Sequence, residues 1–174
     1  FNVLGPLTNP ARVQACAIGA SREENARLMA GVYASRGLSA LVFRGANTGL
    51  DELTTTDANQ VWLVSGGAVV ETSFDARESL GMASSSIEDL AGGEAAENAA
   101  VARDVLSGAG ADAVRDAVAL NVGAGILAWE GLENPVTCSD FEPRMRGAVE
   151  RALAALADGS GARLVERWVA ASNA

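Results

Sequence analysis

The residues whose types and spacing could do chemistry in this sequence are two adjacent carboxylates, Asp51 and Glu52. They lie in a glycine-bearing loop that leaves the carboxyl end of a predicted strand at residues 39–43. In open α/β sheets, ligands bind outside the carboxyl ends of the strands. Because Mg²⁺ keeps several of its waters, one or two protein carboxylates are enough to bind it. The alternative is a solvated loop with two ordinary acidic residues, and the spacing alone favours this alternative.

Three further features could bind phosphate, and each has a simpler interpretation. Residues 54–56 are three threonines with hydroxyls to offer, yet threonines that lead toward a strand are typically β-forming residues. The glycine pair at 92–93 precedes a predicted helix, but two glutamates in the first turn of that helix would repel phosphate. Arg44, at the end of the strand, either holds an anion or pairs with Asp51, and the sequence leaves both possibilities open.

The composition excludes several classes of site. The 174 residues contain no histidine and no lysine, which rules out a histidine base, a Schiff base or a P-loop lysine within the chain. A formal net charge of −9 argues against nucleic-acid backbones and anionic membranes as partners. No apolar stretch approaches the length of a membrane span.

The cysteines and tryptophans are predicted to be structural. Cys16 and Cys138 are far apart and lack CxxC spacing, which indicates reduced, partly buried thiols. Trp62, Trp129 and Trp168 stand on separate predicted elements. We expect them to pack in the core, since no basic and aromatic residues alternate on one surface.

The apolar pattern predicts an α/β fold, with a small, mostly parallel sheet packed by C-terminal helices. Strands at 13–19 and 39–43 flank a helix that begins near Ser21, which makes a right-handed βαβ unit. A Gly-Gly dipeptide between apolar segments 60–65 and 68–74 predicts one hairpin. The connector 1–12 is predicted to be irregular, the segment 75–93 to be a loop with a helical turn near Ile87, and the helices to span 94–107, 112–130, 139–157 and 161–171.

Capping patterns and glycines mark the ends and contacts of these helices. Ser21 with Glu24, and Ser139 with Glu142, have the spacing of capping boxes. Two glycines, Gly123 and Gly125, interrupt one helix at a cost in helix propensity, which predicts that another backbone packs closely there.

Two segments resemble signatures of one family, the anthranilate phosphoribosyltransferases. Residues 1–10, Phe-Asn-Val-Leu-Gly-Pro-Leu-Thr-Asn-Pro, are similar to one signature, and residues 49–54, Gly-Leu-Asp-Glu-Leu-Thr, are similar to the second. Residues 90–98 and 115–121 resemble two further family segments, so the match covers nearly the whole chain.

The resemblance implies a fold and a domain organisation. The family combines a small helical domain with a larger α/β domain, as do class III nucleoside phosphorylases. Residues 1–174 would form a single α/β domain, with 1–12 as a connector. The helical domain and the glycine-rich diphosphate loop would lie upstream of this fragment. Many members have a histidine where this sequence has Arg44, so the resemblance gives that residue no role.

The resemblance also implies an activity. The family transfers the phosphoribosyl group of phosphoribosyl pyrophosphate to the amine of anthranilate and releases pyrophosphate, in tryptophan biosynthesis. Asp51 and Glu52 match the pair that binds Mg²⁺ with the diphosphate, whereas no catalytic or substrate-binding residue is assigned within the fragment. The complete enzyme would be a cytoplasmic homodimer without nucleic-acid or membrane partners, and the fragment alone would be inactive. The alternatives are a related nucleoside phosphorylase and a non-catalytic homologue with a binding role.

Overall fold

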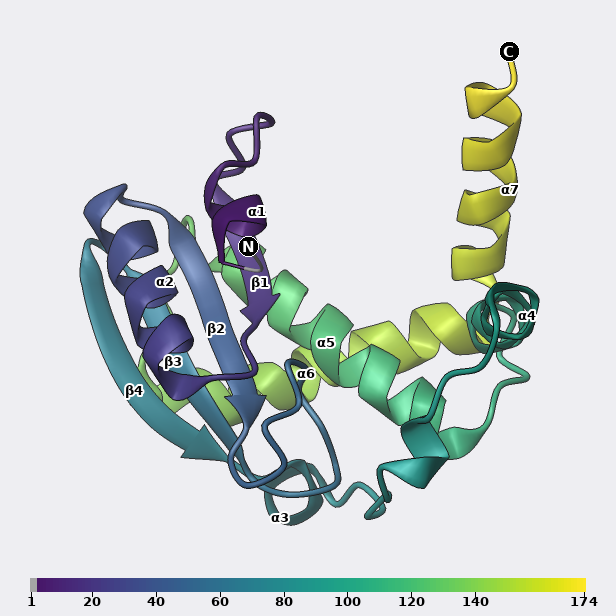
Figure 1. Cartoon of the computed structure of the whole chain (residues 1–174), viewed down its shortest axis with the longest axis horizontal. Coiled ribbons are helices and arrows are strands. Elements are labelled where there is room, and N and C mark those ends of the chain that lie inside the picture. The colour runs from purple at the N-terminus through teal and green to yellow at the C-terminus, as the bar shows by residue number, and fades with distance from the viewer. Residues whose placement is uncertain (1–2) are drawn as a thin grey trace.

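A computed structural model describes residues 3–174, and its centre is a four-stranded sheet (Figure 1). The strands lie in the order β1-β2-β3-β4, with bounds Ala15–Gly19, Ser39–Gly45, Asn59–Ser65 and Ala68–Phe74. The helical elements are α1 Leu4–Leu7, α2 Glu23–Ser35, α3 Ala76–Leu80, the 3₁₀ turn η1 Glu88–Leu90, α4 Ala95–Leu106, α5 Asp112–Glu130, α6 Cys138–Ala157 and α7 Ser160–Ser172.

The βαβ unit is confirmed, because β1 and β2 pair in parallel with Cys16 opposite Ala40. The crossover helix α2 covers one face of the sheet, where Met29 and Tyr33 pack with Trp62. Helices α5 and α6 lie on the opposite face (Figure 1). The sheet is therefore the middle layer of a three-layer α/β arrangement.

The expectation of a mostly parallel sheet is wrong, since the sheet is mixed. The pairings β2–β3 and β3–β4 are both antiparallel. The segment 46–58 between β2 and β3 contains no helix, and a parallel return would need such a crossover. The chain instead turns back beside β2. The predicted hairpin is confirmed between β3 and β4, where Gly66 and Gly67 have φ values of 57° and 78°.

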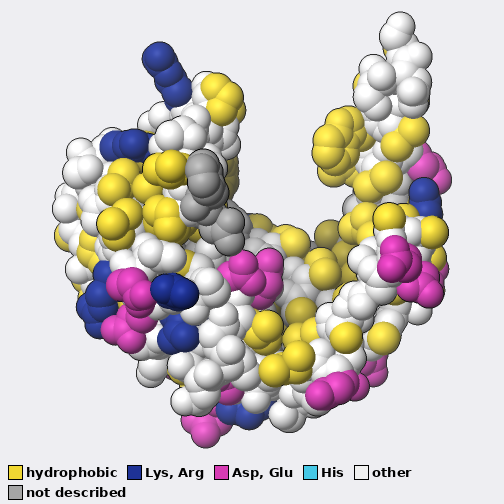
Figure 2. All heavy atoms as spheres, viewed as in Figure 1, with side chains coloured by type: hydrophobic (Ala, Val, Ile, Leu, Met, Phe, Trp, Pro, Cys, Tyr) yellow, Lys and Arg dark blue, Asp and Glu magenta, His cyan; other side chains and the backbone are white. Residues whose placement is uncertain are grey.

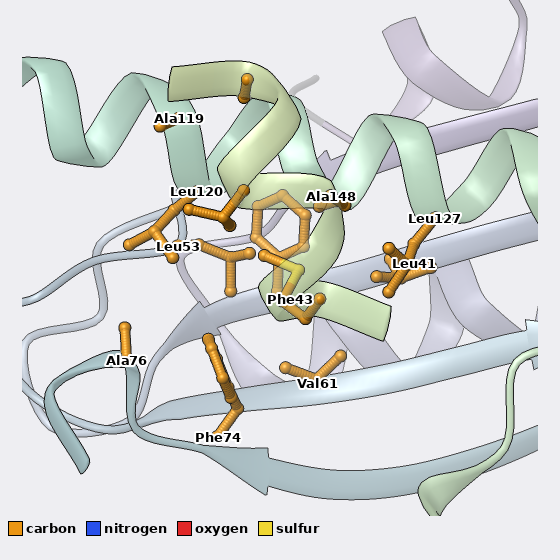
Figure 3. Packing of buried hydrophobic residues seen from close by; sticks show 14 of the residues in the cluster. Leu41, Phe43, Leu53, Val61, Phe74, Ala76, Ala119, Leu120, Leu127 and Ala148 are labelled. Carbon is orange, nitrogen blue, oxygen red and sulfur yellow. The ribbon is translucent and has the colours of Figure 1, made fainter. Parts of the chain in front are cut away.

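The larger hydrophobic core lies between the sheet and the helices α5 and α6. Figure 3 shows Leu53 and Phe43 facing Leu120 of α5, with Phe74 below them. The rings of Phe74 and Phe141 meet edge to face at a centroid distance of 5.4 Å. The core thus includes a residue of the loop 46–58 as well as residues of the regular elements.

The four C-terminal helices begin and end close to the predicted residues, but two capping predictions are wrong. Helix α2 begins after Arg22 with no side-chain cap, so Ser21 does not cap it. The capping box of α6 uses Thr137 and Asp140, because the chain enters the helix earlier than Ser139. Two segments predicted without helix also contain short ones, namely α1 in the connector and α3 after β4.

Burial shows where a helical pattern was misleading. Trp62 is 1% exposed, as expected, but Trp129 and Trp168 are 69% and 72% exposed. A helical period identifies residues on a common face, and it does not determine whether another element covers that face. Both thiols are free; Cys16 is half-buried, while Cys138 is exposed, contrary to expectation.

Helix α7 projects away from the sheet (Figure 1). In Figure 2 the molecule is hollowed between the sheet and this helix. Within residues 3–174, no helix has both the length and the apolar character needed to cross a membrane.

Candidate metal site

The predicted carboxylate pair lies in the loop 46–58 at the carboxyl ends of the parallel strands β1 and β2. The loop passes directly over the last residue of β1. A Cβ atom built on Gly19 would lie 1.5 Å from the carbonyl oxygen of Asp51. Only glycine allows this approach, so the end of β1 determines where the backbone of Asp51 runs.

Asp51 and Glu52 are both exposed, and neither has an ion-pair partner among residues 3–174. Although Glu52 is exposed to solvent, the protein atoms around it reduce the solvation of its carboxylate, and this loss, together with the negative charge of Asp51, raises the pKa of Glu52. The two carboxylates repel each other, and a cation bound between them would offset this repulsion.

Glu52 also faces a groove of about 500 Å³ between the loop and α5. Leu50 and Thr54 of the loop line the groove on one side, and Val114 and Asn121 of α5 line it on the other. The groove gives a bound molecule access to Glu52 from the side of α5.

A buried carboxylate organises the first half of the loop. Asp57 is 8% exposed, and its Oδ2 accepts hydrogen bonds from the backbone N–H groups of Asn47 and Thr48 at 2.6 and 3.0 Å. The hydroxyl of Thr48 donates to the same carboxylate at 3.2 Å. Because unsatisfied buried N–H groups are costly, these bonds hold the turn that leads to the site.

The donor set fits Mg²⁺ better than a metal that needs a complete protein cage. Within the part of the chain that the structure describes, no three His, Cys, Asp or Glu side chains come together as a metal site. Two carboxylates suit Mg²⁺, because this ion keeps several of its waters and commonly takes its remaining oxygen ligands from the phosphates of a substrate. Asp51 and Glu52 would supply the protein oxygens.

The chain is similar to known proteins over nearly its whole length. The family model described as "Glycosyl transferase family, a/b domain" matches residues 1–162. The chain belongs to this family. It is 50% identical over 170 residues to an anthranilate phosphoribosyltransferase of Arthrobacter sp. (strain FB24), covering 98% of this chain and 46% of the relative. It is 48% identical to one of Streptomyces avermitilis, covering 100% of this chain and 47% of the relative.

Solved structures agree with this family assignment. The crystal structure of an anthranilate phosphoribosyltransferase from Thermus thermophilus matches 99% of this chain and 47% of its own, with a TM-score of 0.82 and 35% identity. A Saccharomyces cerevisiae structure in complex with PRPP and Mg shares the fold, with a TM-score of 0.73, 21% identity and coverage of 94% and 44%. The chain spans about half the length of the curated relatives it matches.

The features that the sequence suggested could bind phosphate make contacts within the fold instead. Thr54 and Thr55 are 1% exposed, and the hydroxyl of Thr55 is hydrogen-bonded to that of Ser85 at 2.8 Å. These threonines lie in the loop and precede β3 instead of forming part of it. The glycine pair at 92–93 leads into the capping box of α4, as the helix-start interpretation predicted.

Arg44 does not pair with Asp51 in the described part of the chain. Its Nη1 donates to Oε1 of Gln60 at 2.6 Å and to the carbonyl oxygen of Ala46 at 3.1 Å. It therefore ties β2 to β3 at the base of the loop.

Sequence reasoning missed the polar side chains that hold the loop. Asp57, Asn59 and Asn121 all bond to loop backbone, yet only Asn121 lies in a segment that the family resemblance had marked. The one local signal was an Asp just before a strand and an Asn at its first residue, places where such side chains often bond to backbone.

Proposed function

We propose that this chain is the α/β part of an anthranilate phosphoribosyltransferase. The complete enzyme transfers the phosphoribosyl group of phosphoribosyl pyrophosphate to the anthranilate amine and releases pyrophosphate. Asp51 and Glu52 bind Mg²⁺ in this proposal. The observation that carries it is the exposed carboxylate pair beside Gly19, which has no ion-pair partner among residues 3–174, in a chain 50% identical to a protein of that name.

The reaction is a displacement at the anomeric carbon of the ribose. The nitrogen of anthranilate forms the new bond, the bond from carbon to the pyrophosphate oxygen breaks, and that oxygen keeps the electron pair while the amine gives up a proton. Mg²⁺ offsets negative charge on the diphosphate when it is bound. The protein's contribution is position, since Asp51 and Glu52 sit on a loop fixed to β1 and α5.

Several properties of the complete protein belong to the same proposal and rest on the family resemblance. The single α/β domain would be joined to a helical domain and a glycine-rich diphosphate loop, and the enzyme would be a cytoplasmic homodimer. The 174-residue chain by itself would have no transferase activity, because the diphosphate loop is not among its residues.

The test uses the complete protein that contains this chain. With phosphoribosyl pyrophosphate and Mg²⁺ present, we expect the fluorescence of anthranilate to fall as product forms, with no turnover if either is left out. The same preparation is given nucleosides and inorganic phosphate. Release of free base in that assay would instead identify a nucleoside phosphorylase, and inactivity in both assays would identify a non-catalytic homologue.

A further inference from the structure

We propose that Asn121 of α5 is a positioning residue for the carboxylates Asp51 and Glu52. Its side-chain amide fixes the peptide unit that directly follows Glu52, and so holds this carboxylate toward the groove. The inference rests on the metal role proposed above and adds a residue that determines how well that metal is bound.

The contact is a two-point pairing between a side chain and a backbone. The Oδ1 atom of Asn121 accepts a hydrogen bond from the N–H of Leu53 at 3.0 Å, and its Nδ2 donates to the carbonyl oxygen of Leu53 at 3.0 Å. The same Nδ2 donates to the carbonyl oxygen of Ala117 at 2.9 Å, one turn earlier in α5. The amide is thereby held in one orientation by its own helix before it meets the loop.

These hydrogen bonds act on the peptide unit next to Glu52. The N–H of Leu53 belongs to the planar peptide unit whose carbonyl is that of Glu52. Fixing that plane therefore limits rotation of the Glu52 backbone. The side chain of Leu53 is fully buried in the core, so the chain just beyond Glu52 is held both by packing and by hydrogen bonds.

A second asparagine holds the next residue in the same way. Oδ1 of Asn59 accepts from the N–H of Thr54 at 2.9 Å, and its Nδ2 donates to the carbonyl oxygen of Thr54 at 3.0 Å. Two consecutive residues after the carboxylate pair are thus each clamped by an asparagine. Asn59 is fully buried and also bonds to Phe74, so it supports the fold as a whole.

Asn121 differs from Asn59 because it lines the groove that Glu52 faces. A residue that contributes only to folding has no need to lie there. Groups that orient metal ligands typically change metal affinity about 10- to 100-fold when they are removed. We therefore expect loss of the Asn121 amide to reduce the free energy of metal binding by more than it reduces the free energy of unfolding.

The test compares Asn121→Ala with Asn98→Ala in the complete protein. Asn98 makes the same two-point pairing, with the N–H and carbonyl oxygen of Gly93 at 2.8 Å each, far from the carboxylates in sequence. The probe is Mn²⁺ with inorganic pyrophosphate, and free Mn²⁺ is measured by electron paramagnetic resonance. Asn121→Ala should raise the Mn²⁺ dissociation constant about tenfold, and Asn98→Ala should leave it unchanged.

One further measurement and one replacement variant make the result decisive. Deuterium exchange in the peptide spanning 50–56 should be faster in Asn121→Ala and normal in Asn98→Ala. If Asn121→Ala does not fold, Asn121→Ser replaces it, since the smaller polar side chain keeps a group able to bond. Equal Mn²⁺ affinity in the two asparagine variants would overturn the positioning role.

Glu52→Gln separates this inference from the proposed function. If Glu52→Gln weakens Mn²⁺ binding and Asn121→Ala does not, the metal site stands and the positioning role is wrong. If Glu52→Gln has no effect, the proposed metal site itself is wrong, and the role of Asn121 toward it falls as well.

Discussion

The carbonyl oxygen of Asp51 lies so close to Gly19 that a Cβ atom on this glycine would be only 1.5 Å away. This contact joins the end of β1 to the loop that carries the candidate metal ligands. The obstructing atoms are backbone, so no rotamer change can relieve the clash. Any side chain at residue 19 must push the loop away from the strand.

Gly19→Ala should therefore impair the site. We expect the Mg²⁺ concentration for half-maximal rate of the complete enzyme to rise, and the thermal midpoint to fall. Gly31→Ala in α2 is the matched control, because a Cβ there would meet nothing within 4 Å. That control should be neutral or more stable by about 0.5–1 kcal/mol, since alanine is the better helix former. A normal Mg²⁺ response in Gly19→Ala would show that the loop position is unimportant.

Asp51→Ala and Glu52→Ala should each lower the rate strongly while leaving the thermal midpoint unchanged or slightly higher. The two carboxylates are exposed and repel each other, so neither stabilises the fold. Part of the lost rate should return at high Mg²⁺, because mass action compensates for weaker coordination. Initial rates across a Mg²⁺ series, together with thermal melts, check both statements. A lowered midpoint with an unchanged rate per folded molecule would mean that the pair is structural.

Gly123→Ala should be destabilising by about 1–3 kcal/mol, because a methyl group would be overpacked against α6. Its Cβ would lie 2.9 Å from Cγ2 of Val149 and 3.3 Å from Cε of Met145. Gly125→Ala in the same helix is the control, since a Cβ there would meet nothing within 4 Å. It should stabilise the protein slightly. Urea unfolding of both variants measures the difference, and similar free energies of unfolding would contradict the close packing of α5 on α6.

The ionised carboxylate of Asp75 should stabilise the fold at neutral pH and lose this effect in acid. Hydrogen bonds from the Arg77 side chain, then from its backbone N–H, lower the pKa of Asp75 below its ordinary value of 3.8. A carboxylate with a lowered pKa stabilises the fold above its unfolded-state pKa, and this contribution disappears as the pH falls through the folded-state value. Asp75→Asn should thus melt earlier than the unaltered protein at pH 7. The gap should close as the pH is taken below 3.8, and a gap that persists at the lowest pH would refute the ionic origin.

The sequence was sufficient for features that depend on neighbouring residues. The pattern of apolar residues located β1, β2, the hairpin of β3 and β4, and the four C-terminal helices to within about two residues at most ends. It also located Asp51 and Glu52 in a loop at the carboxyl end of β2. These features follow from backbone propensity and side-chain period, which act over a few residues.

The tertiary structure decided what depends on contacts between distant segments. The antiparallel direction of β3, the exposure of Trp129 and the close packing at Gly123 all depend on which element lies next to which. The sequence had predicted that another backbone packs closely at both glycines. This prediction was wrong at Gly125, two residues away on the same helix, where a Cβ would meet nothing within 4 Å. A helical glycine is flexible wherever it occurs, so only the packed neighbour distinguishes the two positions.

The support of the candidate site shows the same division. The two carboxylates are adjacent in sequence, but Asn121, which clamps the residue after them, is 68 positions from Leu53. Gly19 meets Asp51 from the end of another strand. A hydrogen bond or a close approach between such residues exists only after the sheet and α5 have packed. The sequence therefore determined which residues could bind a cation, and the folded chain determined how firmly they are held.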